Sequence, residues 1–147
     1  MEKNDLVKLL NEIFVPLNFK RKGINWVLNS DELSKLINLQ KSNYSNSFYI
    51  NYGYIIKDLE LTTTTHVENR LASTSKDEQK RITDLLDLET QIPKEQRLAD
   101  LKKIITGKIV VPMQSVNTVA DLLNDVKKQS HFNNIPLIVK RFFDLPE

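Results

Sequence analysis

Two runs of alternating residues give the clearest hydrophobic pattern in the chain, and they predict a β-hairpin. The first run covers residues 35–40 and the second covers residues 48–56. β-Branched and aromatic residues dominate the second run, which favours a strand over a helix. Between them, Asn43-Tyr44-Ser45-Asn46 is typical of a turn. If Ser42 lies opposite Ser47, the facing pairs are Leu39–Ile50, Ile37–Tyr52, Gln40–Tyr49 and Asn38–Asn51.

This register separates an apolar face from a polar face, because side chains alternate along a strand. Ile24 to Leu28 continues the alternation, and Asn29 to Glu32 predicts a turn after it. Pairing Leu28 with Leu33 brings Ile24 opposite Ile37. The apolar face then carries Ile24, Trp26, Leu28, Ile37, Leu39, Ile50 and Tyr52. The polar face carries Asn25, Asn38, Gln40, Tyr49 and Asn51. Lys35 belongs to the apolar face, and we expect its stem to lie flat near the rim while its amine reaches solvent.

Helical periodicity surrounds this predicted meander. Asp5 to Val15 has one apolar stripe, and Pro16 ends or kinks that helix. The three cations of residues 20–22 read as a solvated edge strand rather than a basic face. Residues 62–65, four threonines, favour an extended chain. Further helices are expected after Ser75, Pro93, Thr118 and Pro136, with Gly107 as a C-cap and with Ile109 to Pro112 either prolonging or leaving the second of them.

Together these patterns predict one α+β domain over residues 1–147. We expect an N-terminal helix and an antiparallel sheet of four or five strands in residues 1–72, and C-terminal helices packed on that sheet in residues 73–147. Trp26, Ile37, Leu39 and Ile50 should be buried between the sheet and the helices.

Composition excludes several classes of protein and leaves the role open. Lys+Arg number 21 and Asp+Glu number 19, so the charge gives little reason to expect a nucleic-acid partner. The chain has no cysteine and its first residues do not resemble a signal peptide, which favours a cytoplasmic protein. No apolar run approaches the ~20 residues of a membrane helix. His66 and His131 are the only histidines. No phosphate-loop, dinucleotide, nucleophile-elbow or metal motif occurs, so neither a cofactor nor a metal is expected.

The polar face is the candidate site, because its amides and its aromatic ring suit recognition of a partner. Asn38, Gln40, Tyr49 and Asn51 lie on it, and Gly53 on the same face marks a bulge or a close backbone approach. The alternative is an ordinary wet sheet face, or one that the C-terminal helices cover. His66 and Arg70 share one side of their segment, so they could join such a site.

An ordered series of segments resembles the bacterial family known as domain of unknown function 4304. The series is Phe19-Lys20-Arg21-Lys22-Gly23, Trp26, Ile37-Asn38-Leu39-Gln40-Lys41-Ser42, Phe48-Tyr49-Ile50-Asn51, Gly53, His66 and Arg70-Leu71. The resemblance implies a stand-alone α+β protein without an established activity. Its recurring polar positions match Asn38, Gln40, Asn51, His66 and Arg70 here, and they form either a site or a structural network.

Two hypotheses for the function follow. The first is a non-enzymatic protein-binding module, and its specific form is an immunity protein that binds a polymorphic toxin, since genes of this family resemble immunity genes in size and setting. The second is a small-molecule binder or enzyme centred on His66 and Arg70 beside the polar sheet face. The oligomeric state is open in both.

Overall fold

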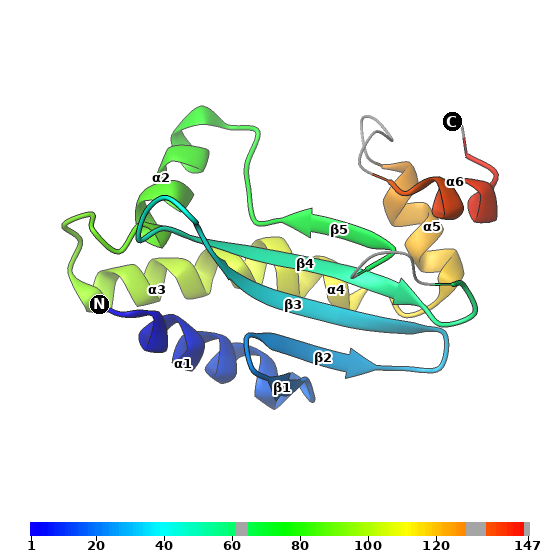
Figure 1. Ribbon diagram of the computed structural model, residues 1–147, viewed down its shortest axis with the longest axis horizontal. Helices are drawn as coiled ribbons and strands as arrows, with labels where there is room; N and C mark the ends of the chain where they lie inside the picture. The colour runs from blue at the N-terminus through cyan, green and yellow to red at the C-terminus, as the bar shows by residue number, and fades with distance from the viewer. Residues whose placement is uncertain (61–64, 129–134, 146–147) are drawn as a thin grey trace.

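The computed structural model describes residues 1–60, 65–128 and 135–145, and it shows a sheet with helices on one side and at both ends (Figure 1). The first half contains α1 (Lys3–Phe14), the 3-10 turn η1 (Val15–Leu17), β1 (Lys20–Lys22), β2 (Asn25–Asn29), β3 (Leu33–Lys41), β4 (Phe48–Ile56) and β5 (Val67–Arg70). The second half contains α2 (Lys76–Leu86), α3 (Lys94–Ile105), the π-helical segment η2 (Thr106–Val110), α4 (Val111–Gln114), α5 (Val119–Lys127) and α6 (Leu137–Phe143). The α+β class and the order of its parts are as predicted.

The sheet is a five-stranded antiparallel meander in the order β1-β2-β3-β4-β5. The predicted β3–β4 register is confirmed, with Leu39 opposite Ile50 and Asn38 opposite Asn51. The β2–β3 register was wrong by two residues, because Leu28 pairs with Lys35 rather than Leu33. Strands β2 and β3 stay paired up to Asn29 and Ser34, and a tight turn joins them, in which the Ser30 N–H donates to the Leu33 carbonyl at 2.9 Å. A shift of two keeps every side chain on its predicted face.

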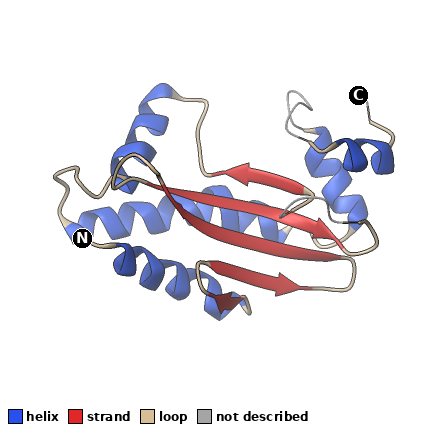
Figure 2. Cartoon of the chain, in the orientation of Figure 1, coloured by secondary structure: helices blue, strands red, loops and turns tan. Residues whose placement is uncertain are grey.

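The apolar face packs on α1 and on the long helix formed by α3, η2 and α4, which lies behind the sheet in Figure 2. The four residues predicted to fill this core are buried: Trp26, Ile37, Leu39 and Ile50. The Trp26 indole N–H donates to Asn11 Oδ1 of α1 at 2.9 Å, so the one polar atom of that ring is satisfied. Ile24, which the predicted register placed opposite Ile37, lies outside β2 and is exposed.

The predicted helix starts are confirmed, with N-caps at Ser75, Pro93, Thr118 and Pro136. Gly107 as a C-cap was wrong. The helix continues through η2 into α4, because Ile109, Val110 and Met113 pack in the core there. Such burial outweighs the weak helix propensity of one glycine. The extended segment expected at residues 62–65 lies outside the described residues, except for Thr65.

Lys35 is a second correction. Its side chain is on the apolar face as predicted, but it is only 6% exposed and its amine does not reach solvent. The ammonium donates to the Met113 carbonyl at 2.5 Å and to Asn117 Oδ1 at 3.0 Å. The chain's own α4 covers the position that we had expected to be a rim.

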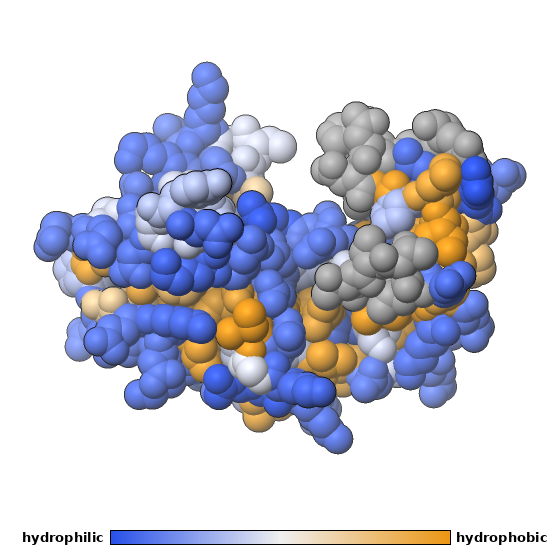
Figure 3. All heavy atoms as spheres, in the orientation of Figure 1, coloured by the Kyte–Doolittle hydropathy of each residue, from blue (hydrophilic) through white to orange (hydrophobic). Residues whose placement is uncertain are grey.

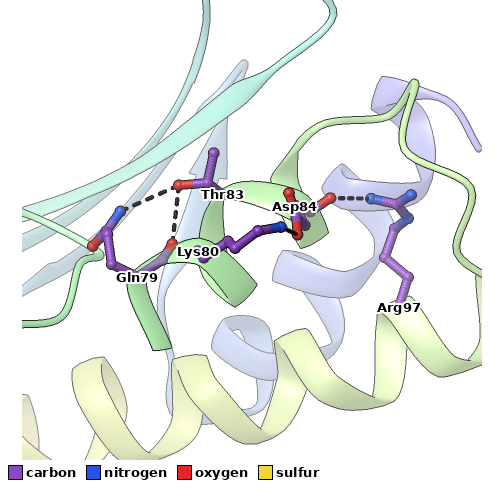
Figure 4. A network of polar contacts seen from close by, with 5 residues as sticks. All are labelled: Gln79, Lys80, Thr83, Asp84 and Arg97. Atoms are coloured by element: carbon purple, nitrogen blue, oxygen red, sulfur yellow. Dashed lines mark hydrogen bonds and ion pairs between the residues drawn. The ribbon is translucent and has the colours of Figure 1, made fainter. Parts of the chain in front are cut away.

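A buried arginine fixes the connection between α2 and α3. Arg97 of α3 donates to the carbonyl oxygens of Asp84, Leu85, Asp87 and Thr90, and Figure 4 shows the bond to Asp84. Burial lowers the pKa of Arg97, while the Asp87 carboxylate raises it. These bonds close the end of α2 and hold it beside the β3–β4 hairpin, where the Leu88 N–H donates to the Asn46 carbonyl at 3.1 Å.

Candidate functional site

One row of polar residues crosses the whole sheet on the face opposite the helical layer. The register places Lys22, Asn25, Asn38, Asn51 and Arg70 opposite one another on five successive strands. We call these five residues the polar row. In Figures 1 and 2 no described helix lies over this face, because α3 and α4 are behind the sheet while α2, α5 and α6 are at its ends. The sequence analysis allowed that the C-terminal helices cover this face, but the described helices do not cover it.

The amides of the polar row form a chain of hydrogen bonds with one direction. Arg70 Nε donates to Asn51 Oδ1 at 3.1 Å, Asn51 Nδ2 donates to Asn38 Oδ1 at 3.1 Å, and Asn38 Nδ2 donates to Asn25 Oδ1 at 2.9 Å. Each asparagine thus accepts one bond at its side-chain oxygen inside the row, and Asn51 and Asn38 each donate to the next asparagine. Asn51 is only 6% exposed, so this network also satisfies a buried amide.

Gln40 and Tyr49 face each other on β3 and β4, two residues along each strand from Asn38 and Asn51 and on the same face of the sheet. Gln40 Oε1 accepts bonds from Asn51 Nδ2 at 2.9 Å and from Arg70 Nη2 at 3.2 Å. The Arg70 guanidinium lies 4.0 Å from the centre of the Tyr49 ring, which is a cation–π contact. Arg70 is exposed and Tyr49 is partly exposed. The stacked pair is a fixed positive and aromatic surface at the β5 end of the row.

A cleft of about 270 Å³ adjoins this pair. Tyr49, Arg70 and Leu71 form its sheet side, and α2 forms the other side through residues that include Gln79 and Thr83. Figure 4 shows these two α2 side chains bound to each other, with Gln79 Nε2 donating to Thr83 Oγ1 at 3.3 Å. The cleft combines apolar walls with hydrogen-bonding groups, so it can receive a side chain of mixed character.

The face that carries the polar row, which we call the open face, has three cations and one carboxylate on its two edge strands. The register puts Lys20 and Lys22 on this face at β1, and Arg70 and Glu68 on it at β5. Arg21 points to the other face, where it lies 5.9 Å from the centre of the Trp26 ring. In Figure 3 hydrophilic atoms cover most of this side over β4, β5 and α2, and apolar atoms reach the surface mainly around β2 and β3 and over α5 and α6. The face therefore suits an acidic ligand surface better than a basic one.

His66 lies apart from this cluster. It is 1% exposed, the Ile56 N–H donates to its Nδ1 at 2.8 Å, and its Nε2 lies 2.8 Å from the Glu60 carbonyl oxygen. The arrangement requires the proton on Nε2, and both ring nitrogens are occupied by main-chain groups. Of the six predicted site residues, five converge: Asn38, Gln40, Tyr49, Asn51 and Arg70. His66 instead ties the end of β4 to the segment after it.

Sequence reasoning missed the contributions of Lys22 and of α2 to this face. Lys22 occupies the same row as Asn25, but three alternating cations gave no reason to single it out. The α2 residues reach the cleft only through tertiary packing, and nothing in their periodicity signals it. Buried Arg97 carried a readable signal, since it stands four residues before Leu101 and eight before Ile105 on one helix face.

Within the described ranges, no three side chains of His, Cys, Asp or Glu are grouped so that they could hold a metal ion. Among the same residues, no helix is long and apolar enough to cross a membrane.

Comparison with known proteins gives one result that bears on this fold. Neither a curated protein nor a solved structure matches the chain. A family profile does match, over residues 10–118, which run from α1 to the N-cap of α5 and include the sheet with the polar row and its cleft. The protein thus belongs to the family described as domain of unknown function DUF4304.

Proposed function

We propose that the protein is a non-enzymatic protein-binding module that takes an acidic partner surface on its open sheet face. The observation that carries the proposal is the exposed Arg70–Tyr49 stack beside a cleft, on a face that no described helix covers. Arginine and tyrosine are, with tryptophan, the residues enriched among the hot spots of protein interfaces. The cations at β1 and β5 supply long-range attraction for an acidic partner.

The stack can act as an anchor because its geometry is already set. Gln40 and Asn51 hold two of the Arg70 nitrogens, and the ring of Tyr49 supports the guanidinium plane. Among the described residues, Arg70 uses only these two guanidinium N–H groups as donors. The others can donate to a carboxylate or a carbonyl group of a partner. A partner side chain that enters the adjoining cleft would contact both residues.

An immunity protein that binds a polymorphic toxin is the specific form of this proposal. It rests on the open face and on the analogy of gene size and setting drawn from the sequence, and under it the partner is a toxin encoded by a neighbouring gene. The second hypothesis, a small-molecule site or enzyme around His66 and Arg70, has less support, because the His66 ring is bound on both nitrogens away from Arg70.

The test first asks whether a toxin gene lies beside the gene of this protein, and then measures the binding of its purified product by isothermal titration calorimetry. We expect Tyr49→Ala and Arg70→Ala each to weaken binding about 30-fold, which corresponds to the ~2 kcal/mol of an interface hot spot. Arg70→Lys should recover only part of the loss, since a lysine keeps the charge but not the planar fork.

The matched control is Tyr44→Ala. Tyr44 is 96% exposed in the β3–β4 turn, so its loss removes an aromatic ring without touching the stack. Binding to this variant should equal that of the wild type. Full binding by the Tyr49 and Arg70 variants, with melting temperatures within a degree or two of the wild type, would place the interface elsewhere. A toxin that does not bind the wild-type protein at all would remove the immunity form of the proposal.

A further inference from the structure

A second concave site lies on the other face of the sheet, and it contains a buried charge. This pocket has a volume of about 190 Å³ between the sheet, α1 and α4, and its walls include Phe14, Phe19, Leu28, Val110 and Met113. It opens beside Gln114 and Asn117, which are exposed. Lys35 is the one charged residue among its lining residues.

The Lys35 ammonium is held by neutral acceptors and has no close counter-ion. It donates to the Met113 carbonyl and to Asn117 Oδ1, and Asn117 is itself oriented by donation from its Nδ2 to the Gln114 carbonyl at 3.0 Å. No ion pair within 4 Å joins Lys35 to a carboxylate among the described residues. An ammonium has three donors, so one N–H remains beyond these two bonds.

The groups around Lys35 determine its pKa and leave its charge poorly compensated. Burial lowers the pKa of Lys35, and the Asp121 carboxylate in the first turn of α5 raises it. Tyr54 lies directly opposite on β4, and burial raises the pKa of that phenol, so it supplies no negative charge at neutral pH. Burying an ion is costly unless a partner of opposite charge compensates it.

We propose that this pocket binds a small carboxylate with an apolar tail, and that Lys35 provides the positive charge that recognises it. The carboxylate would accept the remaining ammonium N–H and would supply the missing countercharge in a poorly hydrated site. The phenylalanine, leucine, valine and methionine walls would cover the tail. A cavity of about 150 Å³ with such walls holds benzene, so the volume fits an aromatic ring or a short chain.

A purely structural Lys35 is the competing explanation. The long helix of α3, η2 and α4 ends near Met113, and an ammonium on its last carbonyl groups is a favourable cap. That role explains the bond to Met113, but it does not require an apolar pocket beside the charge. The two explanations differ in whether a carboxylate binds.

The experiment uses the full chain with selectively ¹³C-labelled methionine methyl groups. The protein has two methionines, Met1 and Met113, so the Met113 methyl is a single reporter in the pocket wall. Benzoate and hexanoate are the probes. Acetate, which lacks the tail, and benzyl alcohol, which lacks the charge, are the control ligands. We expect saturable shifts of the Met113 resonance with benzoate and hexanoate, with dissociation constants on the order of 1 mM for ligands of this size.

Lys35→Leu removes the charge, keeps an apolar side chain and adds no methionine resonance. It should weaken benzoate binding at least tenfold and leave benzyl alcohol binding unchanged. The matched control is Lys41→Leu, at an exposed lysine on the same strand, and this variant should bind benzoate as the wild type does. Absence of a saturable shift in the wild type, or equal binding of benzoate and benzyl alcohol, would overturn the proposal and leave Lys35 as a helix cap. The wild-type comparison decides the matter even if Lys35→Leu fails to fold.

Discussion

Gly53 is the residue at which the lack of a side chain sets the distance between two strands. It lies on the polar-row face of β4, and a Cβ there would overlap the carbonyl oxygen of Val67 on β5. The obstacle is main chain on a paired strand, so it cannot rotate away as a flexible side chain would. The close approach that the sequence suggested at this glycine is therefore confirmed, and it keeps β5, with Arg70, against β4.

Gly53→Ala should therefore destabilise the protein. Forcing a methyl group against the Val67 carbonyl either strains the β4–β5 pair or opens it, and such overpacking typically costs about 1–3 kcal/mol. The free energy of unfolding in urea measures the loss. Gly107→Ala is the control, because a Cβ at this helical position meets nothing within 4 Å and should stabilise the protein by about 0.5–1 kcal/mol. Equal stability of Gly53→Ala and the wild type would refute the steric argument.

Two arginines show what residue type alone leaves undecided. The sequence marked Arg70 as either a site residue or a buried structural one, and the structure places it on the surface against Tyr49. The buried, carbonyl-bound arginine is Arg97 instead. Its periodicity with Leu101 and Ile105 signals burial, whereas the position of Arg70 depends on which neighbours stand on β3 and β4.

At the scale of elements, Arg97 connects α3 to α2 directly, and to the β3–β4 hairpin through the α2–α3 loop. It binds the last carbonyl groups of α2 and those of the loop toward α3, and that loop in turn binds the β3–β4 hairpin. This connection sets where α2 stands beside Tyr49 and Arg70. The shape of the cleft on the open face thus depends on a residue that does not line it.

Arg97→Met should lower the free energy of unfolding by about 3 kcal/mol or more, since carbonyl groups of the α2–α3 connection lose their donor. Hydrogen exchange should also speed up at the Leu88 amide, which bonds to the hairpin. Lys80→Ala is the control on α2. It removes an exposed ion pair with Asp84 and should cost no more than about 0.5 kcal/mol. A stable Arg97→Met with protected Leu88 would show that the loop holds itself.

How far the sequence predicts these elements depends on the range of the interactions. The β3–β4 register follows from local turn chemistry and alternation, so Asn38 and Asn51 could be paired in advance. The predicted β2–β3 register was wrong by two residues, because both pairings put the same side chains on the same face and alternation cannot choose between them. The prediction that a helix ends at Gly107 was wrong, because Ile109 and Met113 pack against residues distant in the sequence and keep the chain helical. Both pockets lie between elements distant in the chain, and no single-segment pattern contains them.

The whole molecule is built on one core. Buried residues from α1, the sheet, α2, α3, α5 and α6 form a single hydrophobic cluster. Among the described residues, the sheet-bearing first part and the helical second part therefore bury apolar surface against each other. The single domain over residues 1–147 stays a prediction, which cooperative unfolding would test.

We expect a single cooperative unfolding transition as a consequence. Trp26 is the only tryptophan and reports on the sheet and α1, while far-ultraviolet circular dichroism reports mainly on the helices. The two probes should give the same midpoint and slope in urea, as two-state unfolding requires. An earlier loss of the helical signal would mean that the C-terminal helices are a separate cooperative unit, and the single-domain description would then fail.

The one-way hydrogen-bond chain of the polar row has a consequence for conformational entropy. From Arg70 to Asn25, each side chain holds the next in one rotamer, so the surface is already ordered before anything touches it. Ordering a free polar side chain on association costs about 0.5–1.5 kcal/mol, and here folding has largely met that cost. A ligand of this face would therefore meet a rigid template, and selectivity would rest on shape and donor positions rather than on adaptation of the surface.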